Sequence, residues 1–224
     1  LVRDPPDSRF DRMEKAILSL HPSVLVIESE RTREVLMGVY DESYHLVCYR
    51  GSANLIGGNP SPKDCCPKDV LLREIKEEFD YSGEGSASRK DLARIREVAL
   101  SKISPFKDFY FQFGKIKGGK KPFNAISSSY HTRMDQETFE IVRNNLNGGK
   151  RITTEGSARI FTLKELVERG EFSTAWFSAP VLNSFFGIRI PIPTEVTFEE
   201  LGTPRQSFGA YNDGFSYDPG WKKV

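Results

Sequence analysis

The chain has 224 residues, and its 32 Lys and Arg residues against 31 Asp and Glu residues leave a formal net charge of +1. A chain so close to neutral has no overall field that would draw it onto a nucleic acid or an anionic membrane, so an anionic partner must be bound by a local patch. Its hydrophobic residues come in short, interrupted runs, and none approaches the roughly 20 apolar residues that a membrane span needs. We therefore expect a soluble protein of one large domain with no membrane partner.

The cysteines give an expectation about the cellular compartment. Cys48, Cys65 and Cys66 form no even disulfide framework, and two of them are adjacent, which favours a reducing compartment. Residues 1–15 are polar and lack the apolar core of a signal peptide. We expect an intracellular, cytoplasmic protein. The first residue is Leu1 rather than Met, so we also expect that the native chain begins elsewhere.

The first quarter of the chain predicts one helix and then an antiparallel meander. Phe10, Met13, Ile17 and Leu20 recur at helical spacing, and the strand-like runs that follow are separated by short charged turns. Gly57-Gly58 ends the last of these runs before a loop. In chain order we expect a helix at residues 9–20 and strands at residues 24–28, 35–40, 44–49 and 53–56.

From Pro67 the period is that of a helix, with Leu71, Leu72, Ile75 and Phe79 within one arc. Later strands and helices alternate irregularly, which favours the α+β class over a parallel βαβ fold. We expect strands at residues 98–103, 108–116 and 159–161, a connection at 117–130, and helices at 136–146, 163–169 and 180–186. We divide the chain into a lead-in with a helix (1–22), a domain (23–187) and a tail rich in Pro, Gly and aromatic residues that packs on it (188–224).

Three carboxylates share one face of the helix that begins at Pro67. At about 100° per residue, Glu74, Glu77 and Glu78 fall on the arc next to the apolar one. Hard oxygen ligands at this spacing suit Mg²⁺ or Mn²⁺, which also bridge to the phosphates of a substrate. The pattern also fits a solvated helix face. Its place after a strand, the Gly57-Gly58 pair and a loop favours the metal site.

This stretch resembles the box of the Nudix hydrolase family, which reads Gly, five residues, Glu, seven residues, then Arg-Glu-aliphatic-x-Glu-Glu-x-Gly-aliphatic. Arg73-Glu74-Ile75-Lys76-Glu77-Glu78 matches the second half in full. The first half departs from the pattern, because counting back from Arg73 places Cys65 at the glutamate position and Asn59 at the glycine position. The nearest glycine, Gly58, precedes the glycine position of the box by one residue. We expect a loop one residue longer than usual, with Asp64 as the nearest replacement for the glutamate.

The resemblance implies an α/β/α sandwich around a mixed, largely antiparallel sheet. It also implies hydrolysis, dependent on Mg²⁺ or Mn²⁺, of a diphosphate in a nucleotide or nucleotide-sugar, that is, a nucleoside diphosphate linked to another moiety. Residues 154–166 are similar to a late family segment in which a loop Glu completes the metal site, here Glu155. The implied catalytic residues are Glu74, Glu77 and Arg73; the metal ligands are Glu74, Glu77, Glu78, Glu155 and Gly58; the substrate-binding residues are Gly57, Gly58, Lys120 and Lys121.

Several alternatives stay open at this point. The altered first half of the box leaves a second hypothesis, a catalytically decayed Nudix domain that senses a nucleotide or binds a protein. The basic cluster of residues 115–121 is either a site for substrate phosphates or an RNA end, or a solvated loop, and no other contact with nucleic acid is expected. His131 is either a general base or a structural residue. The aromatic tail is a place for a homodimer contact or a lid.

Overall fold

The structure, a computed structural model, describes residues 16–18, 20–44, 47–114, 123–154, 157–169, 177–208 and 215–217. Its centre is a sheet with the strand order β4-β3-β2-β7-β6-β9, in which β5 also pairs with β2 and β8 also pairs with β3. The strands are β2 (Ser23–Ser29), β3 (Val35–Val39), β4 (Ala53–Asn54), β5 (Ile56–Gly58), β6 (Ser104–Phe113), β7 (Phe123–Met134), β8 (Ser157–Phe161) and β9 (Val196–Gly202).

The strand β2 forms the middle of this sheet. It pairs in parallel with β7, and the other pairings of the sheet are antiparallel. All residues of β2 are buried, and their side chains alternate between two cores, with Val24 and Val26 on one face and Leu25 and Ile27 on the other. A strand that is apolar on both faces must be covered on both faces. The mixed, largely antiparallel α+β sheet that the sequence predicts is confirmed.

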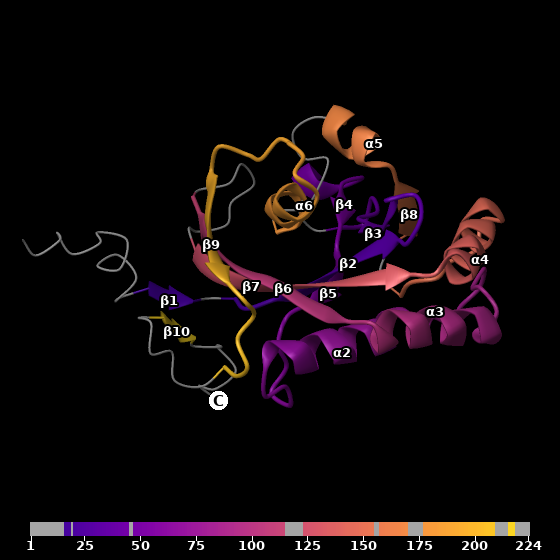
Figure 1. The fold of residues 1–224 in the computed structure, drawn as a ribbon, viewed down its shortest axis with the longest axis horizontal. Coiled ribbons are helices and arrows are strands. Elements are labelled where there is room, and N and C mark those ends of the chain that lie inside the picture. The colour runs from indigo at the N-terminus through magenta and orange to yellow at the C-terminus, as the bar shows by residue number, and fades with distance from the viewer. Residues whose placement is uncertain are drawn as a thin grey trace, which may run out of the picture.

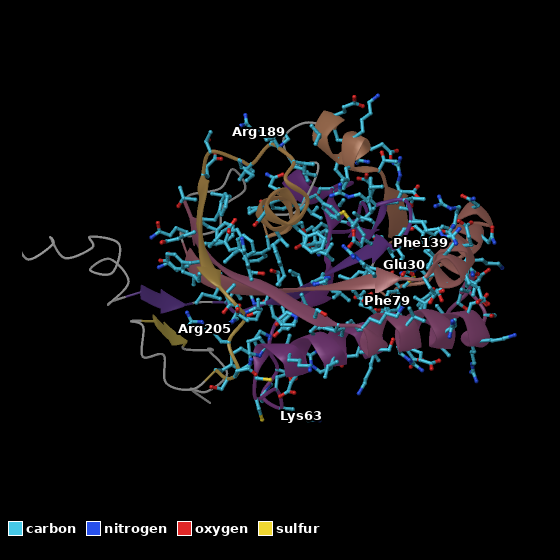
Figure 2. All side chains as sticks on the ribbon, viewed as in Figure 1. Glu30, Lys63, Phe79, Phe139, Arg189 and Arg205 are labelled. Carbon is cyan, nitrogen blue, oxygen red and sulfur yellow. The ribbon has the colours of Figure 1, made fainter. Side chains whose placement is uncertain are left out.

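Helices cover the sheet on both faces (Figure 1). One layer contains α2 (Pro67–Glu78), α3 (Arg89–Ser101) and α4 (Gln136–Asn147), whose apolar residues pack with Leu25 and Ile27. Phe79 lies fully buried between this layer and the sheet (Figure 2). The other layer contains α5 (Leu163–Glu168) and α6 (Ser178–Phe186). This is the α/β/α sandwich that the resemblance implies. In the described part of the chain, no helix has the length and apolarity needed to cross a membrane.

Two of the predicted early elements are wrong. Ala16–Leu18 lie in the predicted helix of the lead-in but form the strand β1, which pairs in parallel with β10 (Phe215–Tyr217). That pairing joins the two ends of the chain, and no local window of sequence can show it. Val47–Tyr49, predicted as the end of a strand, form one 3-10 turn. The predicted pairing of the two preceding strands, β2 and β3, is confirmed.

The strand predicted at residues 98–103 is also wrong through Ser101, where α3 ends. The buried residues of α3 are Leu92, Ile95, Val98 and Ala99, a helical spacing that becomes visible only when the window starts at the N-cap. That N-cap is Ser88, whose hydroxyl accepts a hydrogen bond from the backbone N–H of Asp91 at 3.1 Å. Residues 98–103 include only the last four residues of α3, which are too few to show this spacing.

Two strands of the sheet lie where the sequence predicts no element. β7 begins at Phe123, inside the predicted connection, and β9 lies in the predicted tail and pairs with β6. Ser127–Ser129 of β7 are fully buried, so this strand packs through small polar residues whose strand propensity is weak. β9 is an edge strand with mostly exposed or half-buried residues, which weakens its apolar pattern.

A buried polar cluster joins β6 and β7 to the segments before β2 and after β9. His21 Nε2 lies 3.1 Å from Ser128 Oγ, and Asp108 accepts a hydrogen bond from the backbone N–H of Arg205 at 3.2 Å. Burial, helped by the charge of Arg205, lowers the pKa of His21 from 6.5 to about 3. Burial raises the pKa of Asp108 from 3.8 to about 6, although hydrogen bonds from Ser128 and Arg205 oppose the shift. His21 is therefore a buried neutral base, and Asp108 is a buried acid that keeps its proton to unusually high pH.

We expect these two groups to act on stability with opposite signs between about pH 6 and pH 4. There the unfolded chain protonates His21 and the native chain does not, so this group lowers the free energy of unfolding as the pH falls. The native chain keeps a proton on Asp108 that the unfolded chain releases, so Asp108 raises the free energy of unfolding as the pH falls. Each effect reaches at most about 1.4 kcal/mol per pH unit. Relative to wild type, His21→Gln should gain stability on acidification and Asp108→Asn should lose it.

Urea unfolding of the three proteins at steps between these pH values measures the effect. The comparison with wild type cancels the titration of the surface carboxylates, which the variants share. Parallel profiles for all three proteins would show that neither group titrates differently in the native and unfolded states.

Candidate active site

The helix α2 carries the box carboxylates and is held against the sheet. Pro67 occupies its first turn, where a missing N–H costs no hydrogen bond, and the Pro67 carbonyl accepts from Ser23 Oγ of β2 at 2.7 Å. Leu71, Ile75 and Phe79 are fully buried in the core beneath the helix. This packing turns the adjoining arc, which carries the carboxylates, toward β5.

The strand β5 brings two glycines against its neighbours. Gly57 and Gly58, predicted to end a strand, are instead paired with Val24 and Ser23 of β2. Gly57 has a φ of +154°, and a Cβ there would lie 2.0 Å from Ser23 O. A Cβ on Gly58 would lie 2.3 Å from Cδ of Glu74. The carboxylate of Glu74 therefore rests directly on the backbone of Gly58, in space that any other residue would fill.

Arg73 joins the carboxylates of the helix to the loop that precedes it. Its Nη1 donates to Glu74 Oε1 at 2.8 Å and to Glu77 Oε2 at 3.0 Å. Its Nη2 donates to Asp64 Oδ2 at 3.0 Å and to the carbonyl of Asn59 at 2.8 Å. Arg73 thus positions both glutamates and anchors both ends of the 59–64 loop, and these contacts leave it no role as a direct substrate ligand.

Asp64 is the loop's partner for Arg73. Its side chain is only 5% exposed, and it also accepts a hydrogen bond from the backbone N–H of Ser61 at 2.7 Å. Burial would raise the pKa of Asp64, but the hydrogen bonds from Arg73 and Ser61 outweigh burial and hold it below its ordinary value. The carboxylate is therefore ionised at neutral pH and orders the loop.

The structure also shows where the extra residue of the loop lies. Gly58 and Asp64 are separated by five residues, as the glycine and glutamate of the Nudix box are, and Asp64 and Arg73 by eight instead of seven. Counting back from Arg73 placed Cys65 at the glutamate position, and this is wrong in space, because Cys65 is exposed and Asp64 makes the ion pair. The additional residue therefore falls between Asp64 and Arg73, in the segment that contains the N-cap Cys66 and the start of α2.

Glu77 and Glu78 are adjacent in sequence but lie in different surroundings. The Glu77 side chain is 58% exposed and forms an ion pair with Arg73. Glu78 is buried, and its Oε2 accepts a hydrogen bond from the backbone N–H of Thr154 at 3.1 Å. Glu78 lines a pocket to which Glu77 does not contribute.

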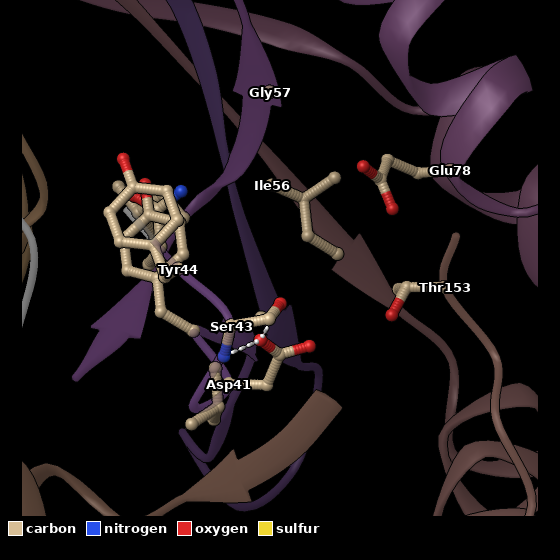
Figure 3. Close-up of a pocket in the computed structure, with 12 residues that line it drawn as sticks. Asp41, Ser43, Tyr44, Ile56, Gly57, Glu78 and Thr153 are labelled. Atoms are coloured by element: carbon tan, nitrogen blue, oxygen red, sulfur yellow. Dashed lines mark hydrogen bonds between the residues drawn. The ribbon is translucent and has the colours of Figure 1, made fainter. Parts of the chain in front are cut away.

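That pocket has a volume of about 310 Å³ and lies between β3, β5 and the end of α2. Figure 3 shows Glu78 and Thr153 on one side of it, Tyr44 on the other, and Ile56 between them. Sequence reasoning predicted Gly57 and Glu78 at this place but missed the residues after β3 and in β4. The lining residues are Gly38, Val39, Tyr40, Asp41, Ser43, Tyr44, Asn54, Leu55, Ile56, Gly57, Glu78 and Thr153.

The metal ligands expected from the sequence are only partly described. Glu155, Lys120 and Lys121 lie outside the described residues. Among the described residues, no group of three or more His, Cys, Asp or Glu side chains is placed to hold a metal ion. Glu74 and Glu78 nevertheless provide two carboxylates one helical turn apart, Glu74 against Gly58 and Glu78 in the pocket that Gly57 also lines. Their oxygen chemistry fits a hard divalent cation.

His131, for which the sequence left both a general-base role and a structural role open, does not line this pocket. It belongs to β7 and packs against Phe185, with ring centroids 5.2 Å apart, in a separate depression that shares no lining residue with the pocket. Burial lowers its pKa. The role of a general base beside the box carboxylates is therefore not supported by its position.

No protein-family model matches the chain, and no curated protein matches it significantly. Similar solved structures include a mutT/nudix family protein from Listeria innocua (TM-score 0.47, 14% identity, 76% of this chain and 93% of that chain) and the C. elegans Ap4A hydrolase (0.40, 13%, 76% and 98%). The E. coli ORF135 protein is a third (0.41, 10%, 76% and 91%).

The chain is an α/β/α sandwich in which α2 lies beside the glycine strand β5, and this is the fold that the sequence resemblance implies. Identities of 10–14% and TM-scores below 0.5 establish neither an activity nor a substrate for it.

Proposed function

We propose that this protein hydrolyses a diphosphate linkage in a nucleotide-type compound, a nucleoside diphosphate linked to another moiety, with Mg²⁺ or Mn²⁺. The observation that carries the proposal is the position of Glu78, a buried carboxylate that lines a pocket together with Gly57. Glu74, one turn earlier, rests on Gly58. Two carboxylates and a close-approaching backbone next to a pocket are what a metal-bound diphosphate requires.

Each residue has a distinct task in this proposal. Glu74 and Glu78 would hold the cation, which when bound neutralises charge on the phosphate oxygens. Glu74 also accepts the proton of the attacking water, whose oxygen bonds to phosphorus as the bond from phosphorus to the bridging oxygen breaks. Arg73 positions Glu74 through its 2.8 Å hydrogen bond. Glu77, held by the same guanidinium, contributes negative charge at the edge of the site.

The test is turnover of a panel of dinucleotides, nucleotide-sugars and nucleoside triphosphates, each with Mg²⁺, with Mn²⁺ and with excess chelator. We expect release of a nucleoside phosphate from at least one class, dependent on the cation. Absence of cation-dependent turnover with every class would reject the enzymatic proposal.

One observation favours a second candidate, a decayed Nudix domain that binds a nucleotide without hydrolysing it. Arg73 pairs with both Glu74 and Glu77, so the positive charge that a cation would bring is partly supplied by the protein. This candidate predicts that a nucleotide raises the melting temperature equally with and without chelator, with no turnover. A shift that needs the cation favours the enzyme.

A further inference from the structure

The pocket contains an amide whose orientation is set by a buried hydroxyl. Ser178, in the first turn of α6, is fully buried. Its Oγ accepts a hydrogen bond from the backbone N–H of Leu55 at 3.0 Å and donates one to Asn54 Oδ1 at 3.1 Å. A serine hydroxyl has a single proton, and here it is directed to the Asn54 oxygen. The amide edge that Asn54 keeps for the pocket is therefore the donor Nδ2.

The wall on the Tyr44 side of the pocket is aromatic. Tyr40 and Tyr44 both line the pocket and stack on each other, with ring centroids 3.9 Å apart and ring planes 13° from parallel. The two rings make a flat, apolar surface, and Tyr44 lies on the side of the pocket opposite Glu78, with Ile56 between them (Figure 3). Such a surface suits a planar ring system, which can stack on tyrosine at low cost in side-chain freedom.

The Glu78 side of the pocket contains a hydroxyl that the protein leaves unsatisfied. Thr153 lines the pocket and is only 2% exposed, and among the described residues its Oγ1 has no hydrogen-bond partner. A buried polar group left in this state costs about 1–3 kcal/mol.

We propose that the pocket receives the base of the nucleotide, and that Asn54 Nδ2 determines specificity by donating a hydrogen bond to a carbonyl on the ring. The ring stacks beside Tyr44, and the sugar and phosphates extend toward Thr153 and Glu78. Ser178 is the positioning residue that prevents the amide from turning. The direction of the phosphates rests on the proposed function, whereas recognition of the base does not.

The test uses pairs of nucleoside monophosphates that differ in one ring substituent and its neighbouring nitrogen. Inosine and uridine monophosphates present a carbonyl where adenosine and cytidine monophosphates present an amino group. Calorimetric titration without divalent cation should show about tenfold tighter binding of the carbonyl member of at least one pair. Asn54→Asp, which replaces the donor by an acceptor of the same shape, should reverse that preference.

Two further variants separate positioning from packing. Ser178→Ala frees the amide to turn, so the preference should fall toward unity while Asn54 itself is retained. Asn54→Ala should weaken binding of the preferred member and also abolish the preference. Because Ser178→Ala removes a buried hydrogen bond, its fold is verified by circular dichroism, and Asn54→Asp carries the test if that variant does not fold.

The outcomes separate this inference from the hydrolytic proposal. A wild-type preference for the carbonyl member that Asn54→Asp reverses, in a protein that hydrolyses nothing, supports the inference and rejects the hydrolase. Hydrolysis of diphosphates by a protein that binds none of the four nucleotides, or binds both members of each pair equally, overturns the inference. A preference that Asn54→Asp leaves unchanged overturns it as well.

Discussion

Glu78→Gln should lower kcat/KM for the diphosphate substrate by at least about 100-fold, or roughly 3 kcal/mol of transition-state stabilisation, without unfolding the protein. Glu78 is a buried carboxylate of α2 that faces the pocket, and the substitution removes its charge at nearly constant shape. The amide oxygen of Gln can still accept the 3.1 Å hydrogen bond from the backbone N–H of Thr154. The loss would therefore come from the missing charge and not from the helix end.

Steady-state kinetics and a thermal melt of the same preparation measure both parts of this prediction. Glu97→Gln is a suitable control, since Glu97 is an exposed residue of α3 and the substitution changes the net charge equally. It should change kcat/KM by less than about twofold. Equal activity of Glu78→Gln and wild type would remove Glu78 from the site.

Substitutions of the two adjacent glycines should separate folding from catalysis. Gly57→Ala is expected to destabilise the protein by about 3 kcal/mol or more, because the new Cβ would lie 2.0 Å from the Ser23 carbonyl oxygen and φ is +154°. The strand β5 would have to move away from β2. Gly58→Ala meets the flexible carboxylate of Glu74 at 2.3 Å instead. The fold should be retained while the carboxylate is displaced, which lowers kcat/KM about tenfold or more.

Urea unfolding gives the stability of each variant, and activity assays at a series of cation concentrations give the catalytic effect. Gly38→Ala serves as the stability control, because a Cβ there would meet its nearest atom, Asn54 O, at an ordinary 3.7 Å. It should change the free energy of unfolding by less than about 1 kcal/mol. Equal stability of the two β5 variants would contradict the close approach of Gly57 to β2.

The helical part of the site followed directly from local spacing. The period of Leu71, Ile75 and Phe79 fixes which side of α2 is buried and places Glu74 and Glu78 on the adjoining arc. The same reasoning failed for α3, because residues 98–103 include only the last four residues of a helix that begins after Ser88. It failed again for β7, because Ser127 and its neighbours are buried without being apolar.

By itself, the sequence determined the class of fold, the box helix and the three carboxylates, because each depends on the type and spacing of residues close together in the chain. Only the tertiary structure decided that Asp64 and not Cys65 pairs with Arg73, and that Glu78 lines the pocket while Glu77 points to Arg73. It also decided that Asn54 and Thr153 belong to this pocket. A local period orients side chains around one helix or strand, whereas a pocket depends on which distant backbone segments are brought alongside it.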